Sequence, residues 1–206
     1  MDQSDINILD VVGDGTFAES VLEKNVASKC VVLDRQTHSG KHAANIETVT
    51  IPFEQYSTEG KFGIITFFEG PEPIKNPDSF LGKLHELLRD DGICVMSTPN
   101  SVGYEILTLK GDSHLCFFDH VSISNTNSLK ALLERNGFEL LHMETNGCLD
   151  VEDIIKDSTK ELDCLMQFMH EKHPEMLKDF QAYLQDNKKF STMRCVFRKK
   201  QGYEKP

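Results

Sequence analysis

Short apolar runs rich in β-branched residues recur along the first hundred residues of the chain, and amphipathic segments separate them. Runs that are continuously apolar are typical of parallel strands covered on both faces. The alternation of such runs with helical patterns predicts an α/β sheet. The expected strands are residues 6–12, 30–34, 46–51, 62–68 and 92–99.

Helix start and stop signals predict two helices on either side of the fifth strand. Asn76 can cap and Pro77 can begin a helix whose apolar stripe continues to Leu88, before the sequence DDG ends it. A second helix is expected over residues 125–136, where an Asn-Gly pair provides the stop signal. Both helices are expected to pack their leucine-rich faces against the sheet.

The last third of the chain predicts a strand, a helical stretch and a final strand. The strand patterns cover residues 138–145 and 191–199, and the helical stretch between them covers 151–187 with an interruption near Pro174. Such an excursion can close the sheet with an antiparallel member. We therefore expect one domain over residues 1–206, in which 151–187 is a helical insertion before the last strand.

The size and polarity of the chain favour a single domain without membrane spans. A chain of 206 residues and 23.3 kDa can bury most of its apolar surface in one core. No stretch approaches the ~18 to 20 consecutive apolar residues of a membrane span, and the acidic start MDQSD differs from the basic start of a signal peptide. These features predict a cytoplasmic protein with no membrane partner.

Charge and cysteine usage exclude further classes of function. A net charge of −11 repels phosphate backbones, so we expect no nucleic-acid partner. The six cysteines are scattered without a CxxC pair, which indicates buried, reduced thiols rather than a zinc site or a disulfide framework.

A glycine turn stands directly between the first predicted strand and the first helix. Its glycines let the backbone approach a ligand, and the helix start offers N–H groups. The spacing Gly13-x-Gly15-x-x-Ala18 fits the dinucleotide fingerprint. Asp34 ends the second strand about 20 residues further on, where a carboxylate would accept hydrogen bonds from ribose hydroxyls. The pattern predicts an adenosine-containing ligand and leaves its identity open.

Three segments resemble the class I S-adenosylmethionine-dependent methyltransferases. The segment FGIITFFEGPEPIKNPDSFLGKLHELLRDDGICVMSTPN is similar to the small-molecule branch that includes the ubiquinone-biosynthesis O-methyltransferases. The segments ILDVVGDGTFAESVL and HLCFFDHVSISNTNSLKALLERNGFEL are similar to this family as well, and together the matches extend to about residue 145. The resemblance implies S-adenosylmethionine as cofactor. It also implies a Rossmann-like α/β sheet of seven strands in the order 3-2-1-4-5-7-6, with the last strand antiparallel and helices on both faces.

The resemblance also implies the roles of individual residues. Glu69 and Glu72 fall on the two glutamates of the family segment, whereas Pro73 falls on its histidine. Either His114 or His120, from the loop after the fifth strand, could supply an imidazole in its place. Because Pro73 removes a ligand, no metal is expected. The expected cofactor-binding residues are Asp10, Gly13, Gly15, Asp34, Arg35, Phe67 and Glu69, and the expected catalytic residues are Glu72, His114 and His120.

The function predicted from these features is S-adenosylmethionine-dependent methylation of a small-molecule acceptor, with oxygen as the expected acceptor atom. Two alternatives remain open. The chain could be a catalytically silent binding or partner module of this fold, because Val12 stands where the family has a glycine and Pro73 replaces the histidine. It could also be an NAD-dependent oxidoreductase, although nothing in the chain matches the catalytic half of such an enzyme. The oligomeric state and the identity of the acceptor do not follow from the sequence.

Overall fold

The structure of the chain, a computed structural model, forms two compact units. Unit 1 comprises Met1–Ser97, Leu129–His142 and Cys195–Pro206, and unit 2 comprises Thr98–Ser128 and Met143–Arg194. The residues that the structure describes are 6–11, 13, 15–33, 45–68, 76–113, 124–145, 154, 164–187 and 189–203.

The strands form a seven-stranded sheet in the order β3-β2-β1-β4-β5-β7-β6. Parallel pairings join β3, β2, β1, β4 and β5 in turn. The last strand, β7, is antiparallel, which confirms the expected fold. Its start lies near the end of β5, where the Asn100 N–H donates to the Ser191 carbonyl at 2.7 Å. The strands are β1 (Asn7–Val11), β2 (Lys29–Leu33), β3 (Ile46–Val49), β4 (Phe62–Phe67), β5 (Leu88–Pro99), β6 (Phe138–Thr145) and β7 (Thr192–Lys199).

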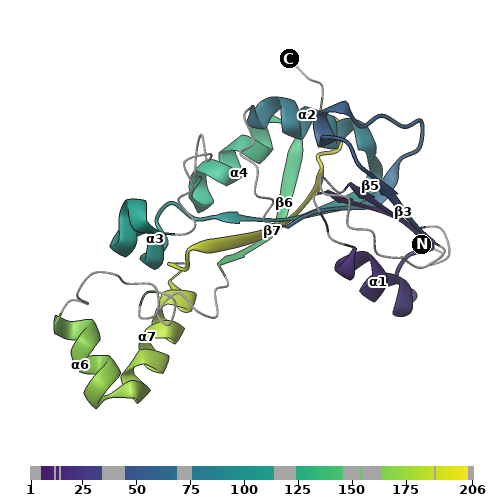
Figure 1. Ribbon diagram of the computed structural model, residues 1–206. Coiled ribbons are helices and arrows are strands. Elements are labelled where there is room, and N and C mark those ends of the chain that lie inside the picture. Colours follow the sequence, from purple (N-terminus) through teal and green to yellow (C-terminus); the bar gives the residue numbers. More distant parts are fainter. Residues whose placement is uncertain are drawn as a thin grey trace. The chain divides into compact units, whose positions relative to one another are not determined.

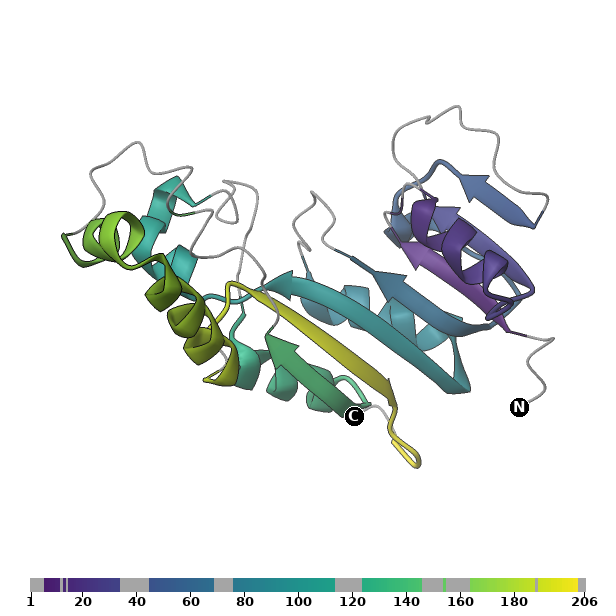
Figure 2. The same cartoon turned by 90° about the horizontal axis from the view of Figure 1, so that it is seen from below.

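Helices cover both faces of the sheet. Figure 1 shows α2 (Pro77–Leu87) and α4 (Thr126–Arg135) on one face and α1 (Thr16–Glu23) on the other. In Figure 2 the purple helix α1 lies in front of the strands and α2 lies behind them. The central strands β1 and β2 each bury four of their five residues, as continuous apolar runs predict.

Helix α2 begins as predicted and ends one residue earlier. The Asn76 side chain accepts a hydrogen bond from the Ser79 N–H at 3.1 Å, which caps the helix start. Leu88, expected on the helix, is instead the first residue of β5, so the predicted strand over 92–99 is four residues longer than expected. Backbones approach closely here, because a Cβ on Gly92 would lie 2.9 Å from the Gly63 carbonyl oxygen. The glycine therefore permits the strand to continue where the sequence suggested a stop.

A surface ion pair joins α2 to α4. The Arg135 guanidinium donates two hydrogen bonds to the Asp78 carboxylate, at 3.0 and 2.8 Å, and the Asn136 amide donates a third at 2.7 Å. These bonds, first from Asn136 and then from Arg135, lower the pKa of Asp78. Both ion-pair partners are exposed, so the pair contributes little to stability at physiological salt.

Unit 2 has its own small apolar core. Its buried members are Ile154, Met169, Leu184 and Phe190. The helices α6 (Cys164–Lys172) and α7 (Pro174–Asp186) supply two of them, and Pro174 separates the helices as the sequence predicts. The short helices α3 (Tyr104–Leu109) and η3 (Lys110–Asp112) were not predicted. Within the described part of the chain, no helix has the length and apolarity that a membrane span needs.

Candidate functional site

The predicted glycine turn lies at the carboxyl end of β1. Gly15 has a φ of 89° and forms the N-cap of α1, where its carbonyl accepts the Glu19 N–H at 2.9 Å. Residues with a side chain rarely adopt this conformation, so glycine is required for the chain to enter the helix in this way. The cap has no side-chain hydrogen bond, and the start of α1 is therefore shaped by backbone alone.

Asp10 lies at the end of β1 and is pressed against the turn. Its side chain is buried, with 2% of the residue exposed. A Cβ added to Gly13 would lie 2.0 Å from Asp10 Oδ2 and 2.5 Å from Cγ. The structure thus brings together three residues that the sequence analysis assigned to the cofactor: Asp10, Gly13 and Gly15. Their contact with a cofactor stays a prediction.

Thr66 on β4 is a member of this cluster that the sequence analysis missed. It is the register partner of Asp10, and its hydroxyl donates to Asp10 Oδ1 at 2.7 Å. Thr66 is fully buried. The signal that could have indicated it is the lone hydroxyl within the apolar strand sequence FGIITF. Burying a hydroxyl costs free energy unless it has a hydrogen-bond partner, so a partner could have been expected.

Phe67 ends β4 and Phe68 follows it directly, and the two rings contact helices on opposite faces of the sheet. Phe67 is buried on the α2 side, where its ring lies 5.0 Å from that of Phe80. Phe68 lies edge-on to Phe17 of α1, with 5.3 Å between the ring centroids. Phe68 therefore lies on the face of the sheet that carries α1, the helix that follows the glycine turn. It was not among the predicted site residues. A contact between Phe67 and a cofactor stays a prediction.

The remaining predicted site residues lie outside the described part of the chain. They are Asp34, Arg35, Glu69, Glu72, His114 and His120. Among the described residues, no three His, Cys, Asp or Glu side chains form a group that could hold a metal ion. The expectation of metal-independent binding thus stays a prediction.

Three thiols in unit 1 are free and buried: Cys30, Cys94 and Cys195. Burial, and to a smaller degree the negative charge of Asp10, raises the pKa of Cys30 to about 11. Burial likewise raises the pKa of Cys195 to about 12 and that of Cys94 well above its ordinary value. These thiols are protonated at neutral pH, so they are poor nucleophiles and poor metal ligands.

Unit 2 contains a buried polar network at the end of β5. The Asn100 side-chain amide donates to the Phe190 carbonyl at 2.7 Å, and the Ser113 hydroxyl donates to Glu105 Oε1 at 2.5 Å. The Ser191 hydroxyl accepts the Glu105 N–H at 2.9 Å. These bonds fix the chain after β5 to the segment before β7, which gives Asn100 a structural role.

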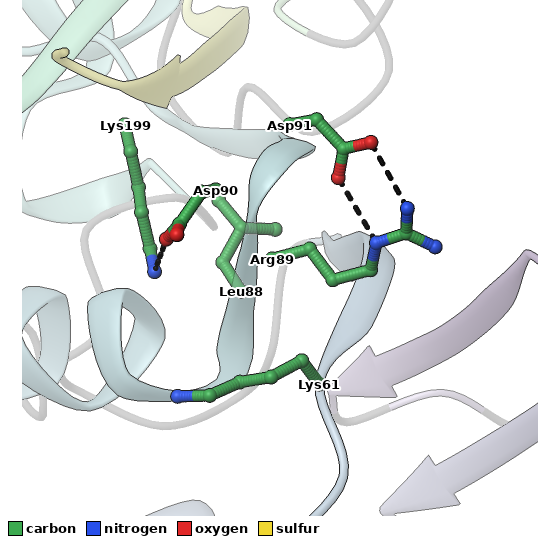
Figure 3. A pocket seen from close by; sticks show the side chains of 6 residues that line it. All are labelled: Lys61, Leu88, Arg89, Asp90, Asp91 and Lys199. Carbon is green, nitrogen blue, oxygen red and sulfur yellow. Dashed lines mark hydrogen bonds and ion pairs between the residues drawn. The ribbon is translucent and has the colours of Figure 1, made fainter. Parts of the chain in front are cut away.

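An open cavity of about 550 Å³ lies at the opposite edge of the sheet, where β4 and β5 begin (Figure 3). Four of its charged side chains form two ion pairs, and the fifth, Lys61, donates through Nζ to the Glu86 carbonyl. Lys199 contacts Asp90 at 2.9 Å, and Arg89 contacts Asp91 at 2.9 Å. The bond from Lys199 also lowers the pKa of Asp90. This cavity is remote from the glycine turn. Its ion pairs join side chains on the surface of unit 1.

The family described as methyltransferase domain has a sequence profile that matches residues 2–143. No curated protein is significantly similar in sequence to this chain. Solved structures with 11 to 13% identity share its fold. One is a Listeria monocytogenes protein assigned to the S-adenosylmethionine-dependent methyltransferases, at 13% identity and a TM-score of 0.63 over 98% of this chain and 93% of that one.

Two further similar structures contain S-adenosylhomocysteine. The O-methyltransferase from a trans-AT PKS multienzyme of Brevibacillus brevis has 11% identity and a TM-score of 0.61, over 97% of this chain and 68% of that one. The 1,6-didemethyltoxoflavin-N1-methyltransferase of Burkholderia thailandensis, with 1,6-didemethyltoxoflavin also bound, has 12% identity and a TM-score of 0.58, over 96% and 72%.

Proposed function

Because this chain belongs to the methyltransferase domain family of S-adenosylmethionine-dependent enzymes, we propose that it transfers a methyl group from S-adenosylmethionine to a small-molecule acceptor. The observation that carries the proposal is the turn at Gly13 and Gly15, which lies against the buried carboxylate of Asp10 in a sheet of this order. The S-adenosylhomocysteine in two proteins of similar fold supports it, because that molecule is what remains of the cofactor after methyl transfer.

The described residues fit such a cofactor at the carboxyl edge of β1. Ligands of open α/β sheets bind outside the carboxyl ends of the strands, where the strand order reverses. β1 is that point, because β2 lies on one side of it and β4 on the other. Helix α1 begins directly after Gly15 and thus directs its first turn, the part of a helix that binds anions, to this edge. We assign the ribose hydroxyls to Asp34, with Arg35 beside it, and the methionine portion to Glu69.

The sulfonium of the cofactor supplies an electrophilic methyl group, so the protein mainly needs to hold the acceptor atom in line and exclude water. A neutral hydroxyl must lose its proton as the new carbon–oxygen bond forms. We assign this proton to Glu72 together with His114 or His120, which follow β4 and β5 in sequence. The pair of glutamates needs no metal for this role.

Oxygen is the acceptor atom that we propose, although proteins of similar fold include both O- and N-methyltransferases. A base is needed for a hydroxyl and is dispensable for an amine with a free lone pair, and the proposed Glu72 and histidine supply such a base. The net charge of −11 favours a small acceptor over nucleic acid. We propose a cytoplasmic location for the same reaction.

Isothermal titration calorimetry with S-adenosylmethionine, S-adenosylhomocysteine and NAD tests the cofactor assignment. We expect one equivalent of either adenosyl ligand to bind and NAD to give no signal; the reverse result would refute the proposal. Formation of S-adenosylhomocysteine is then measured on phenols and on anilines of the same shape. Product from phenols alone supports oxygen as the acceptor atom, and product from anilines alone refutes it. Cofactor binding without product from either set would identify a catalytically silent binding module.

A further inference from the structure

A single polar side chain of β4 lies beneath the glycine turn. The strand is apolar apart from Thr66, which is fully buried at the centre of the sheet. Valine has the same shape and would fit an apolar strand without the cost of burying a hydroxyl. The buried hydroxyl is therefore expected to have a hydrogen-bond partner.

That partner is one oxygen of the Asp10 carboxylate. The Thr66 hydroxyl has one proton to donate, and it lies 2.7 Å from Asp10 Oδ1 but 3.5 Å from the Leu9 carbonyl oxygen. The shorter distance is that of a well-formed O–H···O hydrogen bond, and such a bond is stronger to a carboxylate than to a neutral acceptor. The Thr66 hydroxyl thus donates its proton to Asp10, its register partner on the neighbouring strand.

The other oxygen of the same carboxylate faces the turn. Asp10 Oδ2 lies only 2.0 Å from the position that a Cβ of residue 13 would have. With Oδ1 held from β4, the carboxylate cannot turn away from Gly13 without breaking the bond to Thr66. The three residues therefore form a chain of contacts that runs from β4 through Asp10 to the backbone of the turn.

We infer that Thr66 is a positioning residue of the cofactor site: its hydroxyl holds the Asp10 carboxylate against Gly13 and so fixes the turn on which the cofactor binds. This inference rests on the proposed function for its effect on the cofactor, whereas the effect on the turn can be measured without any ligand. Thr66 is fully buried, so it would act on the cofactor through Asp10 rather than by direct contact.

The test compares three variants with the wild type. Thr66→Val removes the hydroxyl and keeps the shape, and Thr66→Ser restores the hydroxyl. Thr145→Val is the matched control, because Thr145 is also buried in a strand, yet its hydroxyl has no hydrogen-bond partner among the described residues. Circular dichroism and thermal unfolding establish that each variant is folded at the temperature of the measurements.

Titration with S-adenosylhomocysteine is expected to give about tenfold weaker binding for Thr66→Val, because a hydrogen bond to a charged group is lost. Thr66→Ser and Thr145→Val should stay within about twofold of the wild type. Wild-type affinity in Thr66→Val, or a loss that serine does not restore, would overturn the inference. A merely structural role would lower the unfolding temperature of Thr66→Val and leave its affinity for S-adenosylhomocysteine unchanged.

Backbone amide signals of Gly13 and Gly15 in NMR spectra of the ligand-free protein provide the second measurement. We expect both signals to move in Thr66→Val and to return close to their wild-type positions in Thr66→Ser. Unchanged signals in Thr66→Val would overturn the inference. If the wild type fails to bind S-adenosylhomocysteine, the proposed function fails, and the glycine signals still decide whether Thr66 fixes the turn.

Discussion

The contact between Asp10 and Gly13 makes a single methyl group a sharp test of the candidate site. In Gly13→Ala the new Cβ would lie 2.0 Å from Asp10 Oδ2 and 2.5 Å from Cγ, far inside van der Waals contact. The carboxylate is the end of a side chain and can move, but moving it breaks the 2.7 Å bond from Thr66. The variant must therefore lose that bond, retain the clash, or shift the turn.

The expected cost follows from these alternatives. A hydrogen bond to a charged group contributes about 1.5 to 3 kcal/mol, and residual overpacking adds about 1 kcal/mol or more, so Gly13→Ala should lose about 2 to 4 kcal/mol of unfolding free energy. In a chain of this length the unfolding temperature falls by about 5 to 15 °C. Gly82→Ala is the control. Its Cβ meets nothing within 4 Å on α2, so it should gain about 0.5 to 1 kcal/mol.

Urea and thermal unfolding of the single and double variants measure these changes. In an Asp10→Ala background the carboxylate is gone, so adding Gly13→Ala should cost less than about 1 kcal/mol, which gives a coupling energy of at least about 1 kcal/mol. Calorimetry with S-adenosylhomocysteine should show that Gly13→Ala also loses cofactor affinity. An unchanged unfolding temperature in Gly13→Ala, or an equal cost with and without Asp10, would refute this account of the turn.

Three further predictions concern other parts of the chain. Asp34→Ala should weaken the binding of S-adenosylmethionine by about 1.5 to 3 kcal/mol, measured by calorimetry. An unchanged affinity would show that Asp34 does not belong to the site. With the other cysteines changed to serine, the three buried thiols of unit 1 should resist a thiol reagent at pH 8 until urea unfolds the protein; rapid labelling of the native state, or a disulfide mass deficit, would contradict this. The lowered pKa of Asp78 means that its contribution to stability is present above its ordinary value of 3.8 and is lost as the pH falls through the folded value. Asp78→Asn should therefore be less stable than the wild type at pH 7 in low salt and equally stable in acid.

The sheet could be predicted from the sequence because burial on both faces leaves continuous apolar runs. β6 begins and ends at the predicted residues, 138 and 145. The start of β5 could not be predicted in this way. Leu88 follows Leu84 at helical spacing, so periodicity placed it on α2. Only its pairing with Phe62 of β4 shows that β5 begins there. Helix α3 has six residues, too few for a helical period to be recognised.

The candidate site was predictable where one local motif contains it and unpredictable where it depends on strand register. The glycine turn and Asp10 stand within six consecutive positions, so their proximity follows from the sequence. Thr66 lies 56 residues from Asp10, and only the pairing of β1 with β4 brings them together. Phe68 was missed for a similar reason, because its contact with Phe17 of α1 joins residues that are far apart in the sequence.

The location of the candidate site follows from the path of the chain as well as from its motif. After β1 the chain builds β2 and β3 on one side, and it then returns to place β4 on the other side of β1. The helices that follow β1 and β4 consequently lie on opposite faces, α1 on one and α2 on the other. In open α/β sheets, ligands bind at such a point, outside the carboxyl ends of the strands. The hydrogen bond between Asp10 and Thr66 crosses that point of reversal. The carboxylate beside the turn is therefore part of β1 and is held in place by β4. For this reason a substitution on β4 should change the affinity for a cofactor bound over β1.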